Sequence, residues 1–121
     1  MPEDYTSLVA ALKALTQGEA PNTRTLPMCE NEWDTRPDED SWGTVALEFE
    51  ADALHGDDIK VAIAYEGSVD LFSYKKDGDG WPALIRGALT DTCGGCWKLN
   101  SFQYERENRI FHWEWVFQVE E

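Results

Sequence analysis

Cysteine and histidine residues provide the first candidate chemistry in this chain. Cys93 and Cys96 flank two glycines, a spacing found in redox pairs and in one half of a structural zinc site. The residues that could complete a set of four metal ligands are Cys29, His55 and His112. A zinc site of this kind needs a second closely spaced pair, and a thioredoxin-like pair starts a helix, whereas this one follows a predicted helix. We therefore predict neither a metal site nor a redox site, and we interpret Gly94 and Gly95 as a helix C-cap and turn.

Carboxylates near a histidine are a second possibility, because such pairs can act as general acids and bases. In an extended strand His112 and Glu114 share one face, and Glu66 and Asp70 are further candidates. No nucleophile motif, phosphate-binding loop or HExxH motif accompanies them in the sequence. Hydrogen bonds across a sheet explain such residues more simply, so we predict no catalytic residue, no cofactor and no enzyme activity.

The elements that must position these residues are clearest in the last third of the chain. Residues 96–105 and 110–119 are predicted to form a long β-hairpin, because side chains alternate between faces in its second half. One face of that strand collects Phe111, Trp113, Trp115, Phe117 and Val119. Aromatic side chains bury large areas, so we expect this face to cover the chain's own helices, another protein, or both.

Two amphipathic helices are predicted elsewhere. The first has Asp4 as a candidate N-cap, ends near Gly18, and has apolar residues at helical spacing, namely Tyr5, Leu8, Val9, Leu12 and Leu15. The second begins after the DGDGW turn at residues 77–81, with Pro82 in its first turn, and ends before the two glycines. Its apolar face comprises Leu84, Ile85, Ala88 and Leu89.

Strands fill most of the middle of the chain. A loop at 18–27 leads to a candidate edge strand at 27–31, and residues 44–50 alternate as a half-buried strand does. A turn through residues 55–57 follows. Residues 60–74 are longer than most strands, so we expect a bend at Gly67 that divides them into two collinear halves.

Together these elements predict an α+β fold in one domain over residues 1–121: a mixed, mostly antiparallel sheet, an N-terminal helix, a second helix packed on the same face, and a closing hairpin. The 121 residues are 42% hydrophobic, enough for a core without disulfides or metal. Three cysteines and no secretory signal favour reduced thiols, so we expect Cys93 and Cys96 to be structural.

The charge limits the choice of partners. Twenty-four acidic and ten basic side chains give a net charge of −14, which argues against binding to a phosphate backbone. No apolar run approaches the length of a membrane helix, so we expect no membrane association.

A dense acidic segment spans residues 30–58, with Arg36 as its only positive side chain. We interpret its part WDTRPDEDSW, residues 33–42, as a loop anchored by two tryptophans. These tryptophans could fold back onto the sheet or contact a partner. We predict a subunit or partner contact in which Arg36 pairs with acidic groups. The residues of this predicted contact are Trp33, Asp34, Arg36, Asp38, Glu39, Asp40 and Trp42.

The order of these features resembles the tail-terminator, or tail-completion, proteins of bacteriophages with long non-contractile tails. The segments that carry the resemblance are LVAALKAL, WDTRPDEDSWGTVALEFEADALHGDD, IKVAIAYEGSVDLFSY, WPALIRGAL and CWKLNSFQYERENRIFHWEWVFQVE, which together span nearly the whole chain. The resemblance implies a virion protein, assembled in the host cytoplasm. It further implies a hexameric ring that caps the tail tube, stops its polymerisation and meets a head-completion protein. DNA would pass through such a ring without specific binding. CGGC is not a hallmark of that family.

A second class fits the acidity as well. An immunity protein or a nucleic-acid mimic would use its carboxylates to inhibit a basic partner enzyme in a one-to-one complex. A ring needs a heterologous interface between two different patches, and we expect the acidic loop to be one patch and the hairpin or an edge strand to be the other. Portal, head-closure and tail-tube genes beside this one would favour the ring, and a toxin or nuclease gene would favour the inhibitor.

Overall fold

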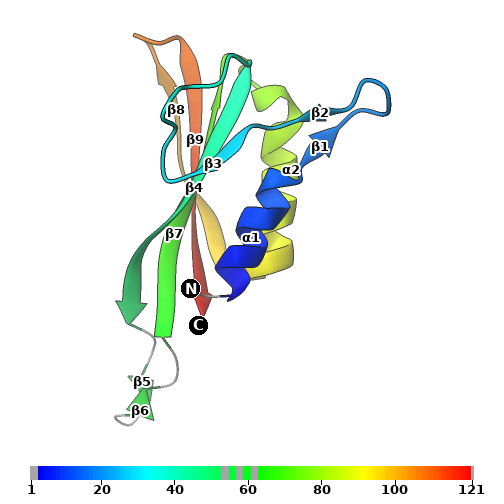
Figure 1. Cartoon of the computed structure of the whole chain (residues 1–121). Helices are drawn as coiled ribbons and strands as arrows, with labels where there is room; N and C mark the ends of the chain where they lie inside the picture. Colours follow the sequence, from blue (N-terminus) through cyan, green and yellow to red (C-terminus); the bar gives the residue numbers. More distant parts are fainter. Residues whose placement is uncertain (1–2, 53–54, 57–58, 61–62, 121) are drawn as a thin grey trace.

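Five strands form one sheet, and two helices cover one of its faces (Figure 1). The structure is a computed structural model that describes the backbone of residues 3–52, 55–56, 59–60 and 63–120, and the side chains of residues 3–48 and 64–120. The strand order is β3-β4-β7-β9-β8. Only the β3–β4 pair in this sheet is parallel, and the other pairs are antiparallel. The α+β prediction, with both helices on one face and a closing hairpin, is confirmed.

The strands of this sheet are β3 (Met28–Glu30), β4 (Ser41–Asp52), β7 (Ile63–Ser73), β8 (Trp97–Glu105) and β9 (Ile110–Glu120). Two small two-stranded pairs stand apart from it: β1 (Thr16–Gln17) with β2 (Arg24–Thr25), and β5 (His55–Gly56) with β6 (Ile59–Lys60). The expected edge strand at 27–31 and the long hairpin are confirmed. The backbone of the expected turn at 55–57 lies only partly within the described residues.

Helix α1 (Glu3–Lys13) buries four of its predicted apolar residues, Tyr5, Leu8, Val9 and Leu12. Two details of the prediction were wrong: Asp4 lies inside the helix rather than at its N-cap, and the helix ends at Lys13 rather than near Gly18. The Tyr5 hydroxyl donates a hydrogen bond to Glu30 over 3.1 Å. Burial, and then this bond, raise the pKa of Tyr5 to about 12, so the phenol remains a donor that joins α1 to β3.

Helix α2 (Trp81–Cys93) begins and ends where its sequence indicates. A short 3₁₀ turn, η1 (Gly78–Gly80), leads into it, Pro82 occupies its first turn, and Gly94 caps it with φ of 59°. That backbone angle favours glycine. The buried face of the helix consists of Trp81, Pro82, Ile85, Ala88 and Leu89.

The core lies between the helices and the inner face of the sheet. Trp115, Phe117, Leu8, Leu12, Ile85 and Leu89 are among its fully buried side chains. Four of the five apolar residues on the predicted face of β9 are less than a tenth exposed, and Phe111 is half-buried. The face therefore serves mainly as the chain's own core.

The expected bend at Gly67 was placed on the wrong strand. Strand β7 runs continuously through Gly67, and the register shift occurs in β4, where Leu47 pairs with Gly67 and Phe49 with Glu66. Glu48 is thus the bulged residue. A glycine is needed at position 67 because a Cβ there would lie 2.3 Å from the Ala46 carbonyl oxygen and 2.6 Å from the Phe117 ring.

Candidate interaction site

The loop between β3 and β4 folds over the face of the sheet that the helices leave uncovered (Figure 1). The Trp33 indole N–H donates a hydrogen bond to the Gly43 carbonyl oxygen over 3.0 Å, and Trp33 is half-buried. A hollow of about 370 Å³ lies beside it. Its lining includes the rings of Trp33, Trp42 and Phe72 and the carboxylates of Glu32 and Asp70.

Trp42 was wrongly assigned to this loop, because it is the second residue of β4. Its ring is 4% exposed, stacks on Phe72 with centroids 5.8 Å apart, and meets the edge of Tyr74 at 5.7 Å. Trp42 pairs with Phe72, which pairs with His112, and this row of side chains lies on the outer face, away from the helices. Trp42 therefore lies between the sheet and the loop and supports the loop.

Arg36 makes different contacts within the chain from those expected. Its guanidinium carbon lies 4.6 Å from the centre of the Trp42 ring and 5.5 Å from that of Tyr74, and it donates a hydrogen bond to the Tyr74 hydroxyl. It does not pair with a carboxylate among the described residues. A planar, weakly hydrated guanidinium stacks readily on aromatic faces. Because Arg36 is held against Trp42 and Tyr74, its positive charge does not neutralise the carboxylates of the loop.

The remaining loop residues present an acidic surface, which we call the acidic loop. Its exposed carboxylates belong to Glu32, Asp34, Asp38, Glu39 and Asp40. Among the described residues its one ion pair joins Asp40 to Lys75 over 3.9 Å, between two well-exposed side chains. Such a pair contributes little, so most of this charge faces solvent unneutralised.

His112 forms the centre of a polar cluster on the same outer face. Its Nε2 lies 2.7 Å from Asp70 and its Nδ1 3.4 Å from Glu105, and its ring stacks on Phe72 at 4.3 Å. Glu114, the partner considered from the sequence, accepts a hydrogen bond from Asn100 instead. The hydrogen bond to Asp70 raises the pKa of His112 above its ordinary value, against the opposing effect of burial.

This cluster does not have the geometry of a nucleophilic triad. Ser68 is 3% exposed and its hydroxyl donates to Glu48 over 2.7 Å, with Asp70 at 3.4 Å. Asp70 thus lies between the serine and the histidine, so the imidazole is not the group that would take the hydroxyl proton. These hydrogen bonds join β4, β7 and β9 across the sheet.

The raised pKa of His112 predicts a pH-dependent stability. Because its pKa is higher in the folded than in the unfolded chain, protonation stabilises the fold fully below the ordinary value of about 6.5. The stabilisation is lost as the pH rises through the folded-state pKa. We expect the stability lost in His112→Gln to be largest near pH 5.5 and smallest near pH 9, as measured by urea unfolding. An equal loss of stability at every pH would contradict this prediction. Asp70→Asn should reduce the pH dependence of the stability as His112→Gln does, because it removes the carboxylate that raises the pKa of His112.

The CGGC segment forms the predicted helix end and turn. The Gly94 N–H donates to the Thr90 carbonyl oxygen and the Cys96 N–H to the Cys93 carbonyl oxygen, each over 3.0 Å. Burial raises the pKa of Cys93, which keeps its thiol protonated and less nucleophilic. Cys29 lies on β3, at the far edge of the sheet.

Among the described residues no three acidic, cysteine or histidine side chains are arranged to hold a metal ion. The side chain of His55, which we considered as a ligand, lies outside the described part.

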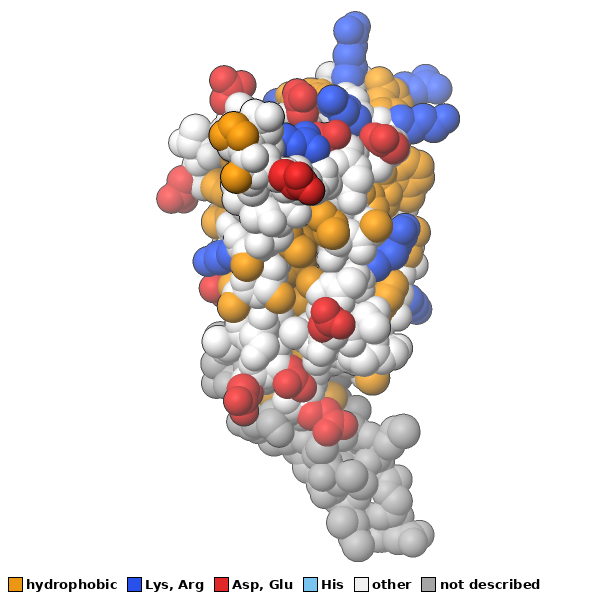
Figure 2. Space-filling model, turned by 90° about the vertical axis from the view of Figure 1, so that its right-hand side faces the viewer, with side chains coloured by type: hydrophobic (Ala, Val, Ile, Leu, Met, Phe, Trp, Pro, Cys, Tyr) orange, Lys and Arg blue, Asp and Glu red, His pale blue; other side chains and the backbone are white. Residues whose placement is uncertain are grey.

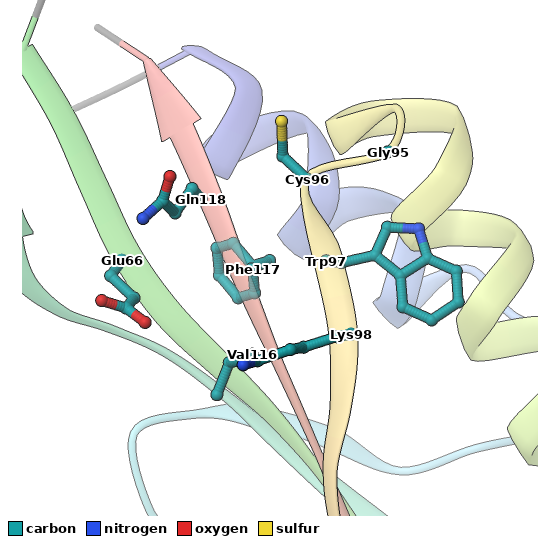
Figure 3. Close-up of a pocket in the computed structure, with 8 residues that line it drawn as sticks. All are labelled: Glu66, Gly95, Cys96, Trp97, Lys98, Val116, Phe117 and Gln118. Carbon is teal, nitrogen blue, oxygen red and sulfur yellow. The ribbon is translucent and has the colours of Figure 1, made fainter. Parts of the chain in front are cut away.

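A hollow of about 330 Å³ lies where this turn enters β8 (Figure 3). Figure 3 shows Glu66 and Gln118 side by side on neighbouring strands, Lys98 directed toward Val116, and the Trp97 ring turned toward α2. The polar groups come from three strands of the sheet's outer face. It contains one cysteine, so it does not bring the CGGC pair to a common ligand.

An exposed hydrophobic patch on β8 was missed from the sequence. Leu99, Phe102 and Tyr104 are 43%, 47% and 49% exposed. Phe102 lies 4.8 Å from Trp113 and Tyr104 lies 4.7 Å from Phe111, measured between ring centroids. A register shift between Leu99 and Ser101 puts Leu99 on the same face as Phe102. We call Leu99, Phe102 and Tyr104 the β8 patch.

Two basic side chains lie next to this patch. Arg106 and Arg109 are exposed in the turn that follows β8, whereas Lys98 is exposed on the opposite face of β8. On the helix-covered side of the molecule, Figure 2 shows Lys and Arg side chains at the upper end and down one side, next to hydrophobic ones. The lower part of the same view carries mainly Asp and Glu side chains. The basic side chains are thus concentrated toward the upper end, where Asp and Glu side chains also lie.

The chain matches no protein-family model, and no curated protein matches it significantly. None of the described helices has the length and apolar character needed to cross a membrane.

Proposed function

We propose that this chain is the subunit of a closed ring and that the ring is a bacteriophage tail terminator. One observation supports this above all: two chemically unlike surfaces lie at opposite edges of one sheet. The acidic loop joins β3 and β4 at one edge, and the β8 patch occupies the other. A contact between unlike surfaces is heterologous, and repeating it generates a ring where the rotation between subunits closes.

The remaining features agree with a structural role in the tail. The polar cluster of the outer face consists of residues that satisfy one another, and the order of elements resembles the tail-terminator pattern. The net charge of −14 suits a ring through which DNA passes, because a negative wall offers few cations to neutralise phosphates. The ring would then stop growth of the tail-tube protein and present a surface to a head-completion protein.

Native mass spectrometry of the purified protein over a range of concentrations, with electron microscopy of tails, tests this proposal. We expect closed rings, either free in solution or at the end of the tail tube. Genes for portal and tail-tube proteins beside this one would support the assignment. Absence of a ring both in solution and at the tail end would refute it.

The acidic loop alone also favours a second candidate, an inhibitor of a basic enzyme. Such an inhibitor would form a one-to-one complex whose affinity falls with salt and would need no β8 patch. A toxin or nuclease gene beside this one, together with such a complex, would replace the ring proposal.

A further inference from the structure

We propose that the β8 patch and its basic side chains dock on the acidic loop of a second copy of this chain. This inference rests on the proposed ring and assigns the two surfaces that close it. It names the contact residues, which the ring proposal by itself leaves open.

Charge complementarity identifies the second copy as the occupant. The turn next to the patch carries two basic side chains, Arg106 and Arg109, against one acidic side chain, Glu107. Lys98 pairs with Val116 and Glu105 lies against His112, so both belong to the outer face of the sheet rather than to the patch. The chain as a whole carries a net charge of −14. The basic turn of one copy is therefore attracted to the acidic loop of a second copy.

The loop offers an apolar contact area as well as charge. Trp33 and Pro37 are half-buried and Tyr74 is 42% exposed, so all three keep surface that Phe102 and Tyr104 of a neighbour could cover. The hollow beside Trp33 combines aromatic rings with the carboxylates of Glu32 and Asp70. The chain's own Arg36 also lines this hollow and stacks on Trp42, so the groups left to meet a neighbour are the exposed carboxylates of the loop and the apolar surface beside them.

The geometry favours a head-to-tail contact over a two-fold dimer. A two-fold contact through the β8 patch would bring its basic side chains near one another, and one through the loop would do the same for carboxylates. Strand addition at β8 is also disfavoured, because the register shift and Lys98 are features that block edge pairing. The contact we propose is therefore made by side chains.

Charge reversal with mixing tests the pairing. The first variant carries Arg106→Glu and Arg109→Glu, and the second carries Asp38→Arg and Glu39→Arg, all at exposed positions. Each variant alone should raise the concentration at which rings form by roughly tenfold or more. Mixed in equal amounts they should assemble again, because each reversed surface then meets its complement on the other variant. The matched control is Ser7→Glu with Ala10→Glu and Lys13→Glu, all exposed on α1, which makes the net charge four units more negative, as the first variant does, but lies outside the contact.

The outcomes separate this inference from the ring proposal. Rings of the wild type that persist in both variants, or that the control also abolishes, would overturn the proposed pairing and leave the ring intact. Rings that persist in the first variant but no longer add to tail tubes would assign the β8 patch to the tube protein, and would overturn the pairing too. A wild type that forms no ring in solution or on tails would refute the proposed function itself. Far-ultraviolet circular dichroism of each variant confirms that loss of rings is not loss of fold.

Discussion

Gly67→Ala should destabilise the chain by about 3 kcal/mol or more, because the new methyl group has no space. A Cβ at this position would lie 2.3 Å from the Ala46 carbonyl oxygen and 2.6 Å from the Phe117 ring. The first atom belongs to the backbone of β4 and the second to a side chain that is 1% exposed, so neither can move without disturbing the core. Urea unfolding measures the effect.

Gly87→Ala is the matched control. Gly87 lies inside α2 and is exposed, and a Cβ added there would have no neighbouring atom within 4 Å outside the helix's own backbone. Alanine there should stabilise the chain by about 0.5 to 1 kcal/mol, since glycine weakens a helix interior. Equal effects of the two substitutions would show that the close approach at Gly67 does not constrain the fold.

Local sequence signals were sufficient for α2, for the hairpin and for the buried face of α1, but not for the ends of α1. Pro82 in the first turn and Gly94 at the end define α2, and the alternating aromatic residues define β9, because these features depend on neighbours in the sequence. The start of β4 could not be found in this way. It begins at Ser41 because Gly43 pairs with Met28 on one side and Leu71 on the other, and both partners are distant in sequence.

The candidate site depends on such distant pairings even more. His112 meets Asp70, 42 residues away, because β7 and β9 pair in a register that the sequence does not state. The β8 patch was missed because Leu99 and Phe102 are three residues apart, which in a regular strand would place them on opposite faces. Only the register shift between them brings them together. The acidic side chains of the loop, in contrast, were apparent from composition alone.

Trp42→Ala should be the most damaging change on the outer face, with a loss of about 3 kcal/mol or more in the free energy of unfolding. The ring is 4% exposed, stacks on Phe72 and holds the Arg36 guanidinium against it, so truncation removes the support of the loop as well as the ring's own burial. Arg36→Ala, which removes the cation and leaves the ring, should cost about 1 kcal/mol. Urea unfolding of both variants measures the difference.

Substitutions at Trp42 also separate support of the loop from direct contact with a partner. If Trp42 acts from beneath, Trp42→Ala should lower both stability and assembly, while Trp42→Phe, which keeps an aromatic ring against Phe72, should recover most of each. If Trp42 itself met the neighbouring subunit, Trp42→Ala would impair assembly at nearly unchanged stability. That second result would contradict the burial of the ring and would move the contact from the acidic side chains of the loop to its aromatic base. The exposed carboxylates would then make no contact with the neighbouring subunit, and the charge-reversed loop variant would still form rings.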